Sequence, residues 1–150
     1  MTDEEAKKLV DFMEQGIPFN VFMGMKVSHV SEGVAEMMIP GRPELTGDPF
    51  RPALHGGVVS TLADTVGGLA VFTQLGKDRI ASTLDLRIDY LRPGAVHQDL
   101  FARANVVRAG NRVAVTHTII FQDDPDKPIA TASAVYNVVT RKKTPHTTDV

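Results

Sequence analysis

The chain has 150 residues, of which 43% are hydrophobic and 23% charged, so it is long and apolar enough to bury the core of one domain. Its formal net charge of −2 argues against a nucleic-acid-binding surface, and the absence of cysteine excludes disulfides, thiolate catalysis and zinc–thiolate sites. The polar N-terminus is unlike a signal peptide, and no apolar run reaches the roughly 18 residues of a membrane helix. We therefore expect a cytoplasmic protein with no membrane segment.

A short helix is predicted at the N-terminus. Thr2 and Glu5 have the spacing of a capping box, and apolar residues recur along residues 2–15. Glycine and proline then end the pattern, so the N-terminal helical segment lies within residues 1–17.

Six stretches alternate between apolar and polar residues, which is typical of half-buried strands. They are 25–30, 33–39, 80–94, two strands within 99–122 that meet at a turn at 109–111, and 128–140. The alternation in the third strand places Leu84, Leu86, Ile88 and Tyr90 on one face and Thr83, Asp85, Arg87 and Asp89 on the other. A proline-rich loop at 40–52 is long enough to suggest a function, and residues 141–150 read as a flexible tail.

The longest helix is predicted at about residues 56–74. Apolar residues lie nearly all round it, which favours a buried helix, and Gly67 and Gly68 would let a neighbouring backbone approach closely. One long helix buried against a single curled antiparallel sheet is an α+β fold. The chain shows no linker or repeat, so residues 1–150 are expected to form a single domain.

Asp64 is the only ionisable residue between His55 and Lys77, the most apolar part of the chain. Burying an unpaired carboxylate costs several kcal/mol, so the residue is either partnered for structural reasons, exposed at an interface, or used in chemistry. Taken by itself, Asp64 leaves the structural and the functional interpretation equally open.

His55, Gly56 and Gly57 stand at the start of the same helix. Backbone N–H groups there have no partner within the helix, the helix dipole is positive, and glycine lets a ligand come close. Such a position suits the stabilisation of a developing oxyanion, although a glycine pair alone also fits a tight turn into a helix.

The spacing of these two features predicts an oligomer. Gly56 and Asp64 are eight residues apart, which is about 12 Å along one helix. A carbonyl group bound at Gly56 therefore cannot also lie beside Asp64 of the same chain. If both act in one reaction, Asp64 must come from a second subunit, and a homodimer with two equivalent interfacial sites is expected.

These residues resemble a known family. The segment LHGGVVSTLAD, with the acid nine residues after the histidine, is similar to the motif of hotdog-fold acyl-CoA thioesterases of the phenylacetate-degradation (PaaI-like) type. MGMKVSHVSEGVAEMMIP, TLDLRIDYLRPG and VVRAGNRVAVTHTIIF resemble further segments of that family in the same order. The resemblance covers roughly residues 18–140 and implies a curled antiparallel sheet wrapped around one long helix.

The resemblance also implies roles for individual residues. Asp64 matches the catalytic carboxylate, acting as nucleophile or as general base, and Gly56 matches the residue whose N–H polarises the thioester carbonyl. The remaining expected site residues are His55 and Thr83 in the catalytic corner, with Gly57, Asp48, Arg108, Gly110, Asn111 and Arg112 in substrate binding. Asp48 stands where the family often has asparagine, so it either raises the pKa of Asp64 or points away.

The expected activity is hydrolysis of an acyl- or aryl-acyl-CoA to the free acid and CoA, without metal or other cofactor. CoA is then part of the substrate, and the chain itself is the only expected protein partner, as a homodimer or as a tetramer built from dimers. Two alternatives stay open at this point: a hotdog hydratase or dehydratase of enoyl- or hydroxyacyl-thioesters, and a non-catalytic acyl-CoA-binding module.

Overall fold

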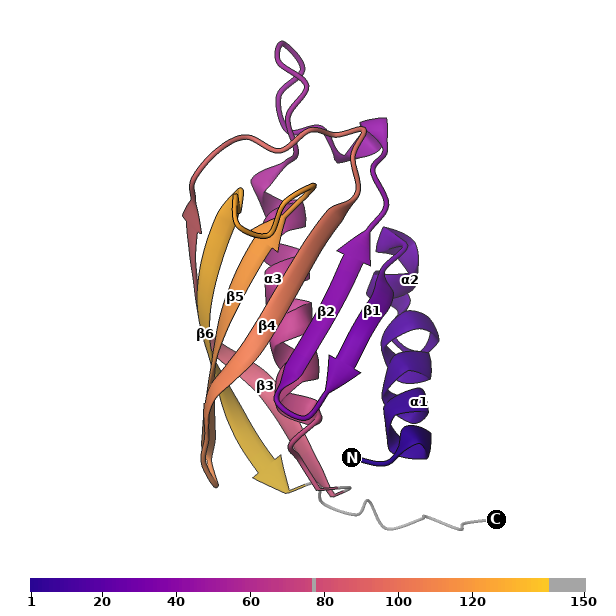
Figure 1. Ribbon diagram of the computed structural model, residues 1–150, viewed down its shortest axis with the longest axis vertical. Coiled ribbons are helices and arrows are strands. Elements are labelled where there is room, and N and C mark those ends of the chain that lie inside the picture. Colours follow the sequence, from indigo (N-terminus) through magenta and orange to yellow (C-terminus); the bar gives the residue numbers. More distant parts are fainter. Residues whose placement is uncertain (77, 141–150) are drawn as a thin grey trace, which may run out of the picture.

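The computed structural model describes residues 1–76 and 78–140, and its elements follow the predicted order (Figure 1). The predicted flexible tail lies outside the described residues. The helical elements are α1 (Asp3–Asp11), the π-helical turn η1 (Phe12–Gly16), α2 (Pro18–Met23), the 3₁₀ turn η2 (Pro43–Leu45) and α3 (Gly56–Phe72). The strands are β1 (Lys26–Ser31), β2 (Val34–Ile39), β3 (Arg79–Tyr90), β4 (Leu100–Ala109), β5 (Val113–Phe121) and β6 (Ala130–Thr140).

The six strands form one antiparallel sheet in the order β1-β2-β4-β5-β6-β3. The sheet curls around α3, while α1 and α2 lie beside β1 (Figure 1). Leu62, Val66 and Leu69 of α3 are fully buried in one core with Met37 of β2 and Ile120 of β5. Burying each such side chain contributes about 1.5–3 kcal/mol, so packing against the sheet holds the helix in place. The predicted α+β architecture is confirmed.

The N-terminal helix begins as predicted and ends differently. The Thr2 hydroxyl accepts from the Glu5 N–H and the Glu5 carboxylate accepts from the Thr2 N–H, which completes the capping box. The helical path continues to Gly16, but its last turn is π-helical. The buried side chain of Asn20 donates to the Met13 carbonyl oxygen over 2.9 Å and so joins this wider turn to α2.

The predicted alternation of β3 is wrong at two residues, Thr83 and Leu84. Thr83 pairs with Tyr136 of β6 and Asp85 pairs with Val135, so Leu84 is the extra residue of a β-bulge. A bulge changes the face on which the following side chains lie. As a result Thr83, and not Leu84, shares the helix-facing side with Leu86, while Leu84 is 61% exposed.

The helix α3 is not buried on every side. Ser60, Thr61, Asp64, Thr65 and Gly68 are all partly exposed and recur at helical spacing. They form an uncovered stripe of small and polar residues along the helix. β3 borders this stripe through Thr83 and Tyr90 without burying it, so the helix is less completely buried than its apolar residues, which lie nearly all round it, predict.

Candidate active site

The start of α3 presents an amide that is open to a ligand. His55 is the N-cap, and its Nδ1 accepts from the Gly57 N–H over 2.8 Å. The backbone N–H of His55 donates to the Leu45 carbonyl over 2.8 Å, which fixes the approach of the chain. The Gly56 N–H has no hydrogen-bond partner among the described residues. His55 thus satisfies one of the orphan donors of the helix and leaves the neighbouring one free.

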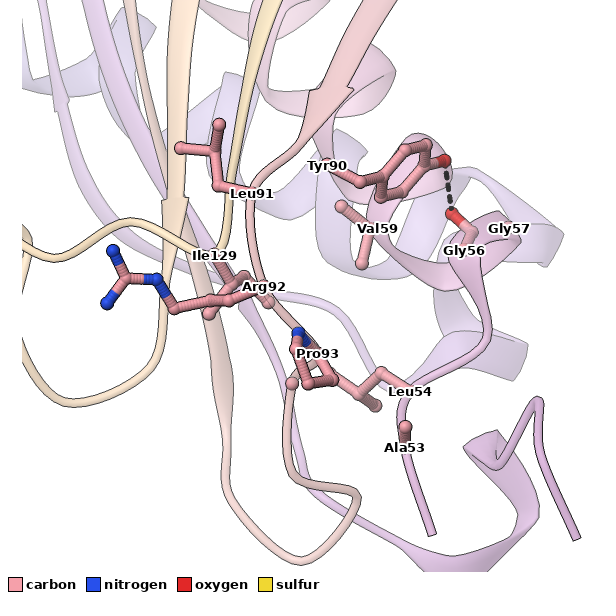
Figure 2. Close-up of a pocket in the computed structure, with 11 residues that line it drawn as sticks. Ala53, Leu54, Gly56, Gly57, Val59, Tyr90, Leu91, Arg92, Pro93 and Ile129 are labelled. Atoms are coloured by element: carbon pink, nitrogen blue, oxygen red, sulfur yellow. Dashed lines mark hydrogen bonds between the residues drawn. The ribbon is translucent and has the colours of Figure 1, made fainter. Parts of the chain in front are cut away.

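A pocket of about 520 Å³ opens beside this amide (Figure 2). Leu54, Val59, Leu91 and Ile129 give it apolar walls, and Gly56 lies at its edge. Substrate pockets are commonly mostly apolar with a few placed polar groups. The pocket therefore fits an apolar ligand with one hydrogen-bond acceptor directed at the start of α3.

Tyr90 is a site residue that sequence reasoning missed. Its hydroxyl donates to the Gly56 carbonyl over 3.0 Å, and Figure 2 shows its ring above the start of the helix. Ser60 Oγ donates to the same carbonyl over 2.9 Å and lies 2.8 Å from the Tyr90 hydroxyl. The predicted strand alternation placed Tyr90 on the same face as Ile88, a signal that it faces the helix. The Ser60 hydroxyl is bonded within this network, and no histidine or carboxylate of the described residues is hydrogen-bonded to it.

Asp64 lies in the uncovered stripe and is held by Thr83. The Thr83 hydroxyl donates to Asp64 Oδ1 over 2.7 Å. Beneath them the Tyr136 hydroxyl donates to the main-chain carbonyl of Asp64 over 2.8 Å. Thr83 thus orients the carboxylate and Tyr136 holds the backbone of the same residue, while Asp64 stays partly exposed and forms no ion pair among the described residues. A partly exposed carboxylate of this kind can act as a base or nucleophile.

One chain does not bring the two halves of the predicted site together. Gly56 and Asp64 belong to the same unbroken helix, so about 12 Å of helix axis separates them. His55 and Gly57 lie with Gly56, whereas Thr83 lies with Asp64. The structure therefore contains two half-sites, one at the start of α3 and one at its middle.

The turn that the resemblance assigned to CoA lies farther away still. The β4–β5 turn, which holds Gly110 and Asn111, is at the opposite end of the sheet from the start of α3 (Figure 1). The Arg79 side chain donates to the Asn111 carbonyl and ties this turn to the start of β3. Arg108 and Arg112 are exposed, and neither forms an ion pair with a described residue.

Asp48 is directed into its own loop. Its carboxylate accepts from the backbone N–H groups of Phe50 and Arg51 over 2.9 and 3.1 Å and pairs with the Arg51 side chain. These two backbone hydrogen bonds are the main reason that the pKa of Asp48 is lowered. The loop protrudes at the top of Figure 1, and its residue Phe50 is 92% exposed.

Comparison with known proteins decides the family. A family model described as the thioesterase superfamily matches residues 52–129, which include both half-sites. The chain belongs to the thioesterase superfamily. This confirms the predicted hotdog fold, the PaaI-like resemblance and the enzyme class, thioester hydrolase.

Relatives match nearly the whole chain. The medium/long-chain acyl-CoA thioesterase YigI of Escherichia coli K12 is 32% identical, over 92% of this chain and 97% of its own. A Shewanella oneidensis protein related to the thioesterase superfamily has a TM-score of 0.80 at 29% identity, covering 91% and 99% of the two chains. A mutant of phenylacetic acid degradation protein PaaI from Thermus thermophilus has a TM-score of 0.71 at 28% identity, covering 81% and 98%.

Proposed function

We propose that this thioesterase hydrolyses acyl-CoA esters with medium or long acyl chains, at sites shared between two subunits. The observation that carries the proposal is Asp64, a partly exposed carboxylate in the middle of the most apolar helix, held by Thr83 over 2.7 Å. The apolar pocket at the Gly56 amide supports an acyl substrate. The similarity to YigI, which is named for medium- and long-chain acyl-CoA, supports the chain length.

The chemistry follows from the two half-sites. The thioester carbonyl oxygen accepts from the Gly56 N–H, where the positive end of the helix dipole stabilises the negative charge that develops on it. Asp64 of the other subunit takes a proton from water as the water attacks the carbonyl carbon, or attacks it directly to form an anhydride that water then opens. The carbon–sulfur bond breaks, and the proton that the water gives up ends on the CoA sulfur, so the free acid and the CoA thiol leave and Asp64 is again a carboxylate.

An antiparallel association through β3 brings the half-sites together. β3 is an edge strand, and a two-fold axis through it places the start of one β3 beside the end of the other. Tyr90 at the end of β3 contacts Gly56, whereas Thr83 near its middle contacts Asp64. The same operation moves the Arg108–Arg112 turn of one subunit toward the pocket of the other, where its arginines suit the phosphates of CoA.

The proposed reaction uses water, one carboxylate and one amide, so we expect neither a metal nor a redox cofactor to be required. Among the described residues, no group of three acidic, histidine or cysteine side chains is arranged to hold a metal ion. None of the described helices is long and apolar enough to cross a membrane. A cytoplasmic location, where acyl-CoA is made and used, is part of this proposal.

Replacement of the carboxylate tests the mechanism. Asp64→Asn keeps the size of the side chain and one acceptor for Thr83, but it removes the base, so thiol release should fall about a thousandfold. Release is followed with a disulfide reagent over a panel of acyl- and aryl-CoA esters of increasing length, with and without a chelator.

Asp123→Asn is the matched control, because it removes one negative charge from an exposed turn outside both half-sites. It should release thiol at the wild-type rate. Undiminished turnover in Asp64→Asn would show that the assigned chemistry is wrong, and no turnover of any ester by the wild type would refute the proposed activity itself.

A further inference from the structure

Two cross-strand neighbours hold Asp64 from the same side of the sheet. Thr83 of β3 and Tyr136 of β6 are direct partners in the strand register, so their side chains lie next to each other facing α3. The Thr83 hydroxyl binds the Asp64 carboxylate over 2.7 Å, and the Tyr136 hydroxyl binds the Asp64 main-chain carbonyl over 2.8 Å. One residue of the helix is therefore bound at its side chain and at its backbone by two adjacent hydroxyl groups.

Tyr136 is suited to act as a permanent donor. Its side chain is only 2% exposed. Burial, together with the nearby Asp64 charge, raises the pKa of the phenol well above its usual range. The hydroxyl consequently stays protonated throughout the pH range in which the enzyme can be assayed, and the bond to Asp64 does not weaken by ionisation.

The glycine pair of α3 is explained by the same contact. A Cβ atom at Gly67 would lie 2.2 Å from the Tyr136 hydroxyl oxygen, which no real contact allows. A Cβ atom at Gly68 would lie 3.6 Å from the Tyr136 ring, an ordinary van der Waals distance. The close approach expected from the sequence is thus made by a side chain and not by a neighbouring backbone, and only Gly67 is required for it.

We propose that Tyr136 is a positioning residue of the hydrolytic reaction. It fixes the position of Asp64 through the backbone carbonyl of that residue, while Thr83 orients the carboxylate. The inference rests on the proposed function. Tyr136 is buried against the backbone of α3 at Asp64 and Gly67, so it does not touch the substrate. Its effect comes through the placement of the carboxylate, and small errors in such placement reduce catalysis strongly.

Tyr136→Phe is the first test, because it removes only the hydroxyl and keeps the ring in the core. Asp64 stays part of α3 without this hydrogen bond, because the helix is held by its own backbone and by the core. The variant should therefore fold. We expect kcat to fall about tenfold with KM unchanged, since the carboxylate acts in the chemical step and not in binding. Thr118→Val, which removes another buried hydroxyl from the neighbouring strand β5, should keep the wild-type kcat.

A matched glycine pair tests the same contact without changing the tyrosine. Gly67→Ala and Gly68→Ala both favour the helix by about the same amount. Only the methyl group at position 67 displaces the Tyr136 hydroxyl. Gly67→Ala should therefore lose kcat about as strongly as Tyr136→Phe, and Gly68→Ala should not, with both variants checked for unchanged mass in solution.

A double variant separates positioning from general loss of stability. If both hydroxyls act on Asp64, Thr83→Val combined with Tyr136→Phe should lower kcat by clearly less than the product of the two single effects. Either of two results would overturn the inference: a wild-type kcat in both Tyr136→Phe and Gly67→Ala, or equal losses in Gly67→Ala and Gly68→Ala. Wild-type turnover that is insensitive to Asp64→Asn would instead refute the proposed function, and this inference with it.

Discussion

The two edge strands of the sheet, β1 and β3, differ in whether other parts of the chain cover them. At the β1 edge, α1 and η1 pack beside the strand, and the Glu14 carboxylate accepts from the Val27 backbone N–H over 2.9 Å. At the β3 edge no described helix covers the strand, and Leu84 and Tyr90 are more than half exposed. Proteins normally protect edge strands because unpaired backbone groups invite association. One edge is closed by the chain's own N-terminus and the other is left open with exposed apolar side chains. This difference supports the proposal that two subunits associate through β3.

The largest expected effect comes from placing a charge on the open edge. Leu84→Glu puts two carboxylates at the proposed two-fold axis, where burying them costs several kcal/mol, so dimers should dissociate and activity should fall about a hundredfold. Light scattering measures the mass of the assembly in solution, and thiol release measures the rate of hydrolysis.

Val107→Glu is the matched control for this variant. Val107 is also the extra residue of a β-bulge and is 59% exposed, close to the 61% of Leu84, but it lies on the interior strand β4. It should leave mass and rate unchanged. Intact dimers of Leu84→Glu would place the subunit contact elsewhere.

A smaller effect, on the free energy of unfolding, is expected when the Glu14 contact that closes the β1 edge is removed. Burial raises the pKa of Glu14, but the hydrogen bond from Val27 and the neighbouring Lys26 outweigh it and leave the pKa below its usual 4.5. Its stabilisation is therefore present at neutral pH and lost as the pH falls through the lowered pKa.

Glu14→Gln should lower the free energy of unfolding by about 1 kcal/mol at pH 7 and remove part of the acid dependence. Urea unfolding at pH 7 and below pH 4 measures both. A variant that unfolds like the wild type at both pH values would mean that this contact does not hold the edge closed.

The smallest effect is expected from the exposed partner of that carboxylate. Lys26 lies 2.9 Å from Glu14, but its side chain is 60% exposed. Lys26→Ala should therefore cost about 0.5 kcal/mol or less, and that loss should vanish at high salt. A loss as large as that of Glu14→Gln would show that charge, and not the hydrogen bond to Val27, closes the β1 edge.

Much of the fold was predictable because buried apolar residues recur at regular intervals along each helix and strand. The capping box at Thr2, the strand alternation and the apolar helix all reflect contacts between each element and the core. The bulge at Leu84 was not predictable in this way, because it depends on how β3 pairs with β6 some 50 residues later in the chain.

The candidate site was predictable in part. Asp64 stands out in the sequence as a lone charge, and its distance from Gly56 along the helix is enough to predict a shared site. For Tyr90 the sequence indicates only the face of the strand, and for Tyr136 it gives no signal, since a tyrosine in a strand is ordinary and its partner is set by tertiary packing. Asp48 carries a signal of its own: an aspartate followed by proline favours a turn in which the carboxylate binds its own backbone.

The most direct test of the account is a mixed dimer. Gly56→Pro removes the free N–H at the first position of α3, where proline is tolerated and where the extended His55 can precede it. Each of Gly56→Pro and Asp64→Asn should be inactive alone. Co-expressed under two tags and purified over both, the heterodimer contains one site with both native groups, so it should recover about half of the wild-type rate. A purified heterodimer as inactive as its parents would contradict a site built from two subunits.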